Sequence, residues 1–416
     1  MRYFAFYIII FVIAVSSCRK SEITVPPPNS NSNLDNTTSL SDTVMKKMEA
    51  IYKLTDGSNL LGTEFVCKVS KYKVSFFSNE SGLFIVLKYG LNPTDSSIQF
   101  SGFWRYSESK AQGQITLSVA KSDGASDFLL NGSTAGLKFT GFVSDENGND
   151  PQAIQWGFER SFTQYAIDHE FIIFAHHGVQ TGSDPPFTEN SLNAAKHAEE
   201  YGCTGLEYDI QLTKDHVPIC AHDASINIRV TQKGPVFGKY MQYNFDFLEN
   251  YVRLTDGEKI PSLEQVLEAF VDSTTLKYFW MDVKGDPDIF KYLEPVIRNA
   301  YANAAAKHRD VVMFAGLPSQ DVIDEFNKQP SYADLPTLCE LSLPDVIATG
   351  SEFFGPRYTL GLLLNDVEEA HSKGIKVFSW TLNSKGIIRD YLVNGKFDGF
   401  ITDYPAYVVY DFYTLF

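Results

Sequence analysis

The sequence predicts an α/β protein with two folded domains behind an N-terminal leader: a small all-β domain and then a (β/α)8 barrel of the TIM type. The chain has 416 residues, which is long for one average domain. Residues 43–160 alternate short β-type runs with polar turns, whereas residues 170–416 alternate strand-like and helix-like segments. These two patterns set the predicted boundaries of the domains.

The first 18 residues resemble a bacterial lipoprotein signal. Arg2 precedes an apolar run over residues 4–15 that is too short to span a bilayer, and two serines and Cys18 follow it. We expect export and a lipid anchor on Cys18 in a bacterial membrane, on the periplasmic side or at the cell surface. An ordinary signal peptide with a chance cysteine is the alternative. Residues 19–42 are rich in Pro, Asn, Ser and Thr, which predicts a flexible tether.

Residues 43–160 are predicted to form a small antiparallel sandwich or barrel. Runs such as SIQFSGFWRY and GQITLSVA are rich in β-branched and aromatic residues, and turn clusters such as SNESG and DENGND separate them. The region contains no cluster of His, Cys or paired carboxylates. A spacer or packing role and the binding of a lipid, a glycan or a surface partner all stay open.

Charge and cysteine content restrict the partners. The formal net charge of −16 argues against nucleic acid, which requires a basic face. An acidic protein that handles an anionic substrate needs local positive charge, most simply a bound metal cation. The cysteines after the leader show no C-x-x-C spacing, which argues against a zinc ribbon, and we expect buried free thiols at Cys67, Cys203, Cys220 and Cys339. Nothing in the sequence indicates an oligomeric state.

The barrel prediction rests on alternating segments from residue 170 onward. The strand candidates are 171–178, 204–209, 217–222, 276–284, 311–315, 337–341, 375–382 and 397–403. The helix candidates are 189–202, 262–270, 287–305, 319–328, 366–374 and 385–395. A doubly wound open sheet is the alternative, but no Gly-rich dinucleotide-binding motif follows the first strand.

Polar residues interrupt the apolar strands at the ends where a parallel barrel carries its chemistry. In the order of the predicted strands these are His176 and His177, Glu207 and Asp209, His222 and Asp223, Asp282 and Lys284, Trp380 and Asn383, and Asp403. Charged groups at the ends of four successive strands must be paired or coordinated if they are buried. We therefore expect one active site at this end of the barrel.

The spacing of the acids predicts a metal site. Glu207 and Asp209 lie two residues apart on a strand, so their side chains share one face and repel each other. A divalent cation removes that repulsion, and Asp282 can supply a third oxygen. An all-oxygen site suits Mg²⁺ or Ca²⁺. His176 and His222, on the predicted strands that flank Glu207 and Asp209, can act as general acid and base.

This ordered set resembles the glycerophosphodiester phosphodiesterase family. The segments HHG, TENS, EYD, TKDH, HD, DVK and WTLN occur here in the order that the family shows, and GEKIPSLEQVLEAF and DGFITDYP also look like family segments. The resemblance covers about residues 171–408 and leaves the all-β domain unexplained.

The resemblance implies metal-dependent hydrolysis of glycerophosphodiesters to glycerol 3-phosphate and an alcohol. It implies one divalent cation held by Glu207, Asp209 and Asp282, and an acid/base pair formed by His176 and His222. It also implies substrate or phosphate contacts for Glu189, Lys284, Trp380 and His177.

The chain departs from the family pattern at several positions. His177 replaces the usual arginine and cannot form the same bidentate contact with phosphate. Asp282 replaces a glutamate, His216 replaces a turn glycine, and the loop before Glu189 is longer. Two other functions stay open for this reason: a phospholipase D-like or sphingomyelinase D-like activity on lysolipids, and a non-catalytic surface lipoprotein that binds lipid or glycan.

Overall fold

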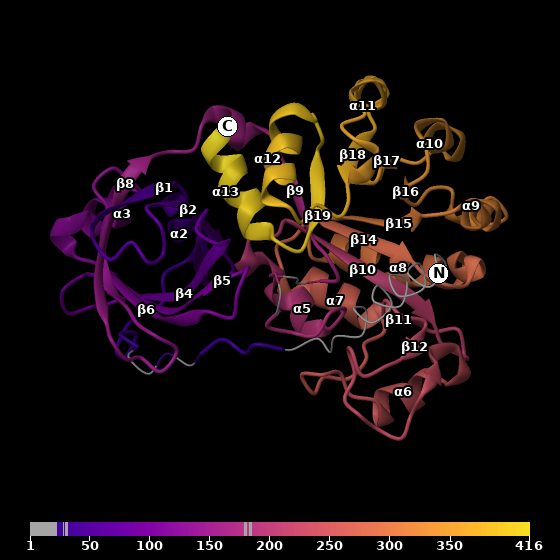
Figure 1. The fold of residues 1–416 in the computed structure, drawn as a ribbon, viewed down its shortest axis with the longest axis horizontal. Helices are drawn as coiled ribbons and strands as arrows, with labels where there is room; N and C mark the ends of the chain where they lie inside the picture. Colours follow the sequence, from indigo (N-terminus) through magenta and orange to yellow (C-terminus); the bar gives the residue numbers. More distant parts are fainter. Residues whose placement is uncertain (1–22, 28, 30–31, 179–180, 183–184) are drawn as a thin grey trace, which may run out of the picture.

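The computed structural model describes the chain except for residues 1–22, 28, 30–31, 179–180 and 183–184. Two barrels lie side by side, one at the left and one at the right of Figure 1. Cys18 and the predicted signal segment lie outside the described residues. Within the described part of the chain, no helix combines the length and the hydrophobicity that crossing a membrane requires.

The first barrel is antiparallel and closed, so the prediction of a small sandwich or barrel resolves to a barrel. Its strands are β1 (Ile51–Gly57), β2 (Glu64–Ser70), β3 (Lys73–Ser78), β4 (Leu83–Leu91), β5 (Ile98–Tyr106), β6 (Gln112–Val119), β7 (Lys138–Val143) and β8 (Gln152–Arg160). Each strand pairs with the next, and β8 pairs with β1. Closure leaves no sheet edge that another chain could extend.

Aromatic rings fill the interior of this barrel. Tyr52 packs edge-on against Phe139, with ring centroids 5.2 Å apart, and Trp156 packs against Phe65 at 4.3 Å. These side chains are at most 1% exposed. Helices α2 (Asp42–Met45) and α3 (Ala125–Asn131) add Met45 and Phe128 to the same core.

The described part of the segment predicted as a tether runs along the antiparallel barrel. The Asn29 amide donates to the carbonyls of Gly102 and Ile115, each at 2.9 Å, and Asn33 donates to the carbonyl of Leu117 at 3.0 Å. These bonds connect the segment to β5 and β6.

The second barrel is parallel and closed, as the alternating pattern predicts. Its strands, in order around the barrel, are β9 (Ile172–Ala175), β10 (Gly205–Leu212), β14 (Tyr278–Val283), β15 (Val312–Leu317), β16 (Thr337–Cys339), β17 (Phe353–Phe354), β18 (Lys376–Ser379) and β19 (Gly399–Thr402). The helices around it are α5 (Leu192–His197), α7 (Leu263–Ser273), α8 (Phe290–Ala306), α9 (Gln320–Phe326), α10 (Leu343–Thr349), α11 (Leu364–Ser372), α12 (Lys385–Asn394) and α13 (Pro405–Leu415).

The prediction that residues 217–222 form the third barrel strand was wrong. These residues contain β11 (Pro218–Cys220), which pairs antiparallel with β10 through a turn at residues 213–217. The physical reason is the length of the connection, because a parallel crossover needs about a dozen residues or more. The strand next to β10 is β14, and His222 therefore lies on a loop beside β10 instead of on a neighbouring barrel strand.

The strand that completes the barrel is β17, which the sequence did not predict. It has only two residues, Phe353 and Phe354, and pairs with β16 and β18. A run this short gives no periodic signal. The predicted total of eight barrel strands was right, but residues 217–222 were counted in place of β17.

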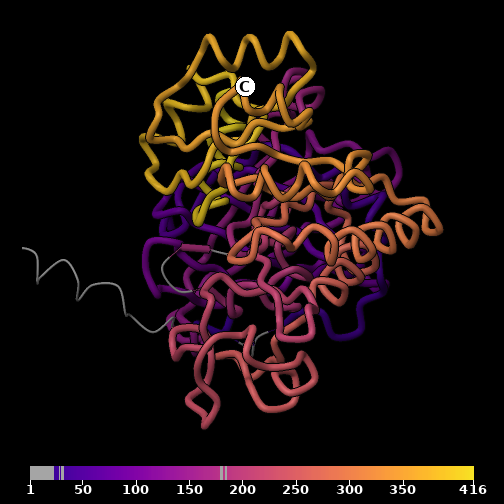
Figure 2. The backbone as a smooth tube through the Cα atoms, turned by 90° about the vertical axis from the view of Figure 1, so that its right-hand side faces the viewer, coloured from indigo at the N-terminus to yellow at the C-terminus, as the bar shows by residue number. Residues whose placement is uncertain are grey.

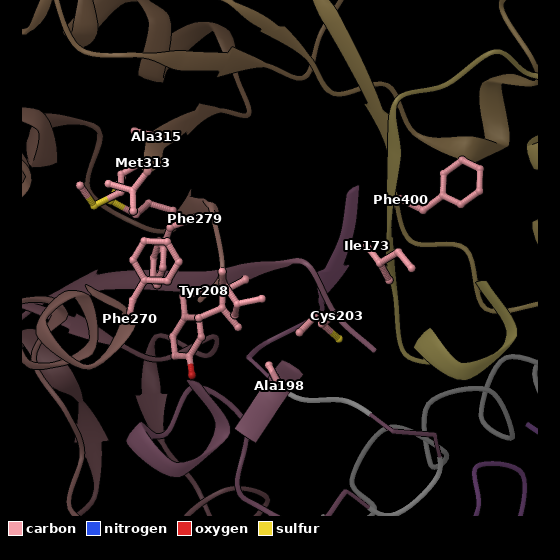
Figure 3. Close-up of a cluster of buried hydrophobic side chains, with 14 of the residues drawn as sticks. Ile173, Ala198, Cys203, Tyr208, Phe270, Phe279, Met313, Ala315 and Phe400 are labelled. Atoms are coloured by element: carbon pink, nitrogen blue, oxygen red, sulfur yellow. The ribbon is translucent and has the colours of Figure 1, made fainter. Parts of the chain in front are cut away.

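Alternate residues of the parallel strands face opposite sides. One set fills the barrel interior with Phe174, Trp280, Phe314, Phe378 and their neighbours. The other set packs outward against the helices, as Figure 3 shows for Tyr208 and Phe279 beside Phe270 of α7. Residues two positions beyond the interior aromatics therefore face the C-terminal end of the barrel.

Residues 221–262 form an insertion that protrudes beside the end of β10. It contains β12 (Ser225–Ile226), β13 (Gly238–Lys239) and α6 (Phe245–Tyr251), and both views show it at the bottom of the molecule (Figures 1 and 2). Leu248, Val252 and Leu254 belong to its own apolar core. The insertion carries His222 and Asp223 at its start.

The two barrels share one apolar contact surface. Phe77 and Phe84 of the antiparallel barrel belong to the same buried cluster as Tyr407 and Phe412 of α13. Tyr410 of α13 donates to Glu64 at 2.7 Å, which adds a polar contact across the junction. The prediction of buried free thiols is confirmed, since Cys67, Cys203, Cys220 and Cys339 are all buried and unpaired.

Candidate active site

Three carboxylates converge at the C-terminal end of the parallel barrel. Glu207, Asp209 and Asp282 each offer an oxygen, and these atoms lie within 4.8 Å of one another. Asp209 and Asp282 are direct cross-strand neighbours on β10 and β14. Glu207 and Asp209 are 2% and 0% exposed, so the structure brings together the acids that the two-residue period predicted.

The chemistry of this cluster fits a divalent cation. Burial raises the pKa of Glu207 well above its usual value, and the adjacent Asp209 carboxylate raises it further. The pKa of Asp282 is also raised, chiefly by burial. Glu207 Oε1 is buried and has no hydrogen-bond partner among the described residues. A cation held by Glu207, Asp209 and Asp282 would offset this repulsion and satisfy that oxygen.

Lys284 supplies positive charge to the same cluster. Its Nζ lies 2.6 Å from Asp282 Oδ2 and 3.3 Å from Asp209 Oδ1. Burial acts to lower the pKa of Lys284, but the two carboxylates outweigh it and the pKa is raised. Lys284 is therefore a permanent cation at neutral pH, placed where it can face an anionic substrate.

His176 is oriented by the end of the last strand. Its Nδ1 donates to Asp403 Oδ1 at 2.6 Å, and Asp403 also accepts from the amide of Asn383. Because a carboxylate only accepts, the proton of neutral His176 resides on Nδ1 and Nε2 has the free lone pair. This arrangement suits a histidine that accepts a proton at Nε2.

His177 contacts the carboxylates themselves. Its Nδ1 donates to Asp209 Oδ2 at 2.6 Å, and its backbone N–H donates to Glu207 Oε2 at 2.9 Å. Burial opposes protonation, but Asp209 prevails and raises the pKa of His177 to about 10. The residue at the position of the missing arginine is therefore a half-buried histidine that pairs with Asp209, and this contact favours its protonated form.

His222 is oriented by a network from the insertion. Its Nδ1 donates to Asp223 Oδ1 at 3.0 Å, and Arg229 Nη2 donates to Asp223 Oδ2 at 2.8 Å. Arg229 also forms a bidentate pair with Glu189, at 2.6 and 2.7 Å. The sequence motifs identified Glu189 and His222 but not Arg229, because no spacing pattern marks a single arginine in an insertion.

The structure thus places the candidate residues in two groups. His176, His177 and Glu207 form one set that could hold a metal ion, and Glu207, Asp209 and Asp282 form the other. Glu189 belongs to neither set, and both of its oxygens contact Arg229. Trp380 follows β18, and its indole donates to the Gly355 carbonyl at 2.7 Å.

At two positions where the sequence departs from the family pattern, the backbone adopts a left-handed conformation. His216, at the position of the turn glycine, has a φ of 60°, a left-handed conformation that glycine adopts more easily. His177 has a φ of 52°, and its contacts with Glu207 and Asp209 hold this less favourable backbone in place.

A comparison with known protein families matches part of this chain. Residues 180–308 match the model of the Glycerophosphoryl diester phosphodiesterase family. The chain contains a domain of this family. The matched region includes Glu189, Glu207, Asp209, His222, Asp282 and Lys284, whereas His176 and His177 precede it.

Two relatives of this phosphodiesterase domain match along nearly their whole length. The glycerophosphodiester phosphodiesterase of Caldanaerobacter subterraneus is 26% identical over 249 residues, which are 57% of this chain and 96% of the relative. The enzyme of the same name from Bacillus altitudinis is 26% identical over 244 residues, 56% of this chain and 94% of the relative.

Solved structures also resemble the domain. A glycerophosphodiester phosphodiesterase from Parabacteroides distasonis is 22% identical, with a TM-score of 0.45, and covers 57% of this chain and 94% of its own. A phosphodiesterase from Oleispira antarctica, solved in complex with the product sn-glycerol-3-phosphate, is 17% identical with a TM-score of 0.46. That match covers 58% of this chain and 97% of the other.

Proposed function

We propose that the protein hydrolyses glycerophosphodiesters to glycerol 3-phosphate and an alcohol. The family match over residues 180–308 supports phosphodiester hydrolysis, and the two relatives bear the name of this activity. The observation that carries the proposal is the pair of carboxylate-oriented histidines, His176 and His222, beside the carboxylates Glu207, Asp209 and Asp282.

The two histidines perform the proton transfers. One accepts the proton of the attacking hydroxyl, which belongs to water or to the substrate's glycerol, and the other donates a proton to the leaving alcohol. If the glycerol hydroxyl attacks, the product is a cyclic phosphate, and water then opens this ring to give glycerol 3-phosphate. Asp403 and Asp223 fix the tautomers of His176 and His222, so each ring presents Nε2 to the substrate. The two carboxylates also stabilise the imidazolium form that each histidine passes through.

Positive charge near the phosphoryl group lowers the barrier to attack. Lys284 is placed to neutralise charge that develops on the non-bridging oxygens. A divalent cation held by Glu207, Asp209 and Asp282 would supply further Lewis-acid polarisation of the phosphodiester. The all-oxygen donor set favours Mg²⁺ or Ca²⁺ as that cation.

We also propose that the protein acts outside the cytoplasm, anchored to a membrane. The apolar run at residues 4–15 followed by Cys18 supports export and lipid anchoring to a bacterial membrane. Labelling cells with a fatty-acid probe tests this, because the wild-type chain should incorporate the label and Cys18→Ala should not. A labelled Cys18→Ala chain would refute the anchor at Cys18.

A substrate panel tests the function directly. Glycerophosphocholine, glycerophosphoethanolamine and lysophosphatidylcholine are incubated with the full chain and Mg²⁺ or Ca²⁺, with and without chelator, and released glycerol 3-phosphate and choline are measured. We expect turnover of the glycerophosphodiesters, and loss of turnover with chelator. Turnover of lysophosphatidylcholine alone would replace the proposal with a phospholipase D-like activity.

A further inference from the structure

The C-terminal end of the barrel interior divides into two unlike halves. Each strand places one residue two positions beyond the residue that fills the middle of the barrel. From β19 through β14 these residues are Asp403, His176, Asp209 and Asp282, and from β15 through β18 they are Gly316, Glu340, Gly355 and Trp380. The first half contains the proposed chemistry. The second half combines two glycines with a carboxyl group and an indole, and neither Gly316 nor Glu340 takes part in the proposed chemistry.

Glu340, from this second half, and Trp280, from the interior aromatic layer on β14, share an unusual feature. Glu340 Oε1 and Trp280 Nε1 are both buried, and neither has a hydrogen-bond partner in the described part of the chain. Trp280 is only 1% exposed. Buried polar atoms are nearly always paired in folded proteins, so two orphans at one place call for an explanation.

The two atoms face the same space above Gly316. A Cβ atom added to Gly316 would lie 3.1 Å from Glu340 Oε1 and 3.1 Å from Trp280 Nε1. Any side chain at position 316 would therefore crowd both atoms. Because position 316 carries no side chain, the Glu340 carboxyl group and the Trp280 indole N–H meet no competing side-chain atom at this point.

We propose that Glu340 and Trp280 bind a hydroxyl group of the substrate's polyol moiety above Gly316, and so make the site selective for a glycerol-bearing phosphoester. This inference rests on the proposed function and assigns residues to its substrate recognition. A hydroxyl can accept from Trp280 Nε1–H and donate to Glu340 at the same time. An ammonium group only donates, so it would leave the indole N–H unpaired.

The reacting half of the site adjoins this contact, because the charges of Asp282, Lys284 and Glu207 all act on Glu340. Asp282 lies on the same strand as Trp280 and one strand away from Gly316, so a phosphoryl group beside Asp282 would place an attached glycerol near Gly316. Sites that hydrogen-bond a substrate hydroxyl reject analogues without it strongly, because the buried protein groups are then left unpaired.

Binding of two matched phosphate monoesters tests the inference. Glycerol 3-phosphate and propyl phosphate share the phosphate and the carbon chain but differ in the hydroxyls. Calorimetry with the full chain and Mg²⁺ should show about ten-fold or more tighter binding of glycerol 3-phosphate by the wild type. E340Q should narrow this ratio by about ten-fold, and W280F, which keeps the ring but removes the N–H, by about three- to five-fold. E368Q, at an exposed glutamate paired with Lys396, should keep the wild-type ratio.

Several results would overturn the inference. An unchanged ratio in folded E340Q would do so, and so would an equal loss of affinity for both compounds or weakened binding of Mg²⁺ alone, because Glu340 would then act through the metal site. If circular dichroism shows that W280F is unfolded, the affinity ratio measured with E340Q alone tests the inference. Hydrolysis of glycerophosphocholine by the wild type is measured separately. An inactive wild type that still discriminates between the monoesters refutes only the function, and an active one that does not discriminate refutes only this inference.

Discussion

The two barrels of this protein fill their interiors in the same way and end differently. Phe76, Phe139 and Trp156 occupy the middle of the antiparallel barrel, and Phe174, Trp280 and Phe314 occupy the middle of the parallel one. Beyond its aromatic layer, the parallel barrel brings Glu207, Asp209 and Asp282 together, although they repel each other. The antiparallel barrel shows no comparable set of convergent metal-binding side chains among its described residues.

A carboxylate that is partly or fully buried therefore has a different role in each domain. Glu49, near the start of the antiparallel barrel, pairs with Lys68 at 2.6 Å. Glu207 has the carboxylates of Asp209 and Asp282 as neighbours and one orphaned oxygen in the described part of the structure, and His177, with Nδ1 4.0 Å from Glu207 Oε2, offsets the repulsion only in part. Glu49 stabilises the fold through its ion pair, whereas the Glu207 carboxylate is unfavourable when no cation is bound. The difference teaches that charge pairing, more than burial, separates structural acids from functional ones in this molecule.

The largest effect should come from Glu207→Gln. This change removes a proposed cation ligand, so we expect activity to fall by about three orders of magnitude. It also removes repulsion from Asp209, so the melting temperature in chelator should rise. Enzyme assays and differential scanning calorimetry, with and without Mg²⁺, measure both quantities. Glu268→Gln, at an exposed position on α7, is the matched control, and a less stable metal-free E207Q would contradict the repulsion.

The next effect concerns the two histidines. His176→Ala and His222→Ala should each lower kcat by about 10²- to 10³-fold, as expected for loss of a general acid or base. The affinity for Mg²⁺, measured by calorimetry, should change much less than in E207Q. His308→Ala, on an exposed turn, is the control. Near-normal kcat in either active-site variant would exclude that histidine from proton transfer.

Much of this site was predictable because β-structure has a strict period. Glu207 and Asp209 had to share a face, and polar residues after apolar runs had to meet at one end of a parallel barrel. Glu340 follows Leu338 by two residues, just as Asp282 follows Trp280. The same period would have identified Glu340 if it had been applied to that strand.

Other parts of the site depend on contacts that no local pattern contains. The pairs His176–Asp403 and Arg229–Glu189 join residues that are 227 and 40 positions apart. Strand β17 is too short to show a period, and residues 217–222 have the composition of a buried strand although their connection to β10 is too short for a parallel one. The period of the strands predicted the barrel and the acids that meet at its C-terminal end, while tertiary packing determined the neighbours.

The third prediction tests stability in the antiparallel barrel. Glu49→Gln leaves the Lys68 charge without its partner and should destabilise the fold by about 2 kcal/mol, a value discounted for partial exposure, with activity retained. Replacing both residues, with E49Q and K68M together, should cost less than E49Q alone. Urea unfolding followed by fluorescence measures each variant. A loss of activity in folded E49Q would contradict the separation of roles between the domains.

The same pair predicts a pH dependence. Burial lowers the pKa of Lys68, but Glu49 more than offsets this and the net pKa in the folded state is raised. A raised pKa adds stability that is fully present below the unfolded value of about 10.4 and is lost as the pH rises through the folded value. The stability difference between wild type and E49Q should therefore be constant near neutral pH and shrink only at strongly alkaline pH. If the stability difference between wild type and E49Q shrank between pH 6 and 8, a titratable group other than Lys68 would be responsible for it.

The smallest effect should come from Arg229, which acts on the chemistry only through its neighbours. Arg229→Gln removes the charge that links Asp223 to Glu189, so His222 loses an orienting contact but keeps its hydrogen bond to Asp223. We expect kcat to fall by about ten-fold with little change in KM, because a misplaced proton donor or acceptor slows the chemical step more than binding. Arg229→Lys keeps the charge but not the bidentate geometry, so it should recover only part of the rate. A rise in KM without a change in kcat would instead make Arg229 a direct substrate contact, and it would place the missing phosphate-binding arginine of this family on the insertion.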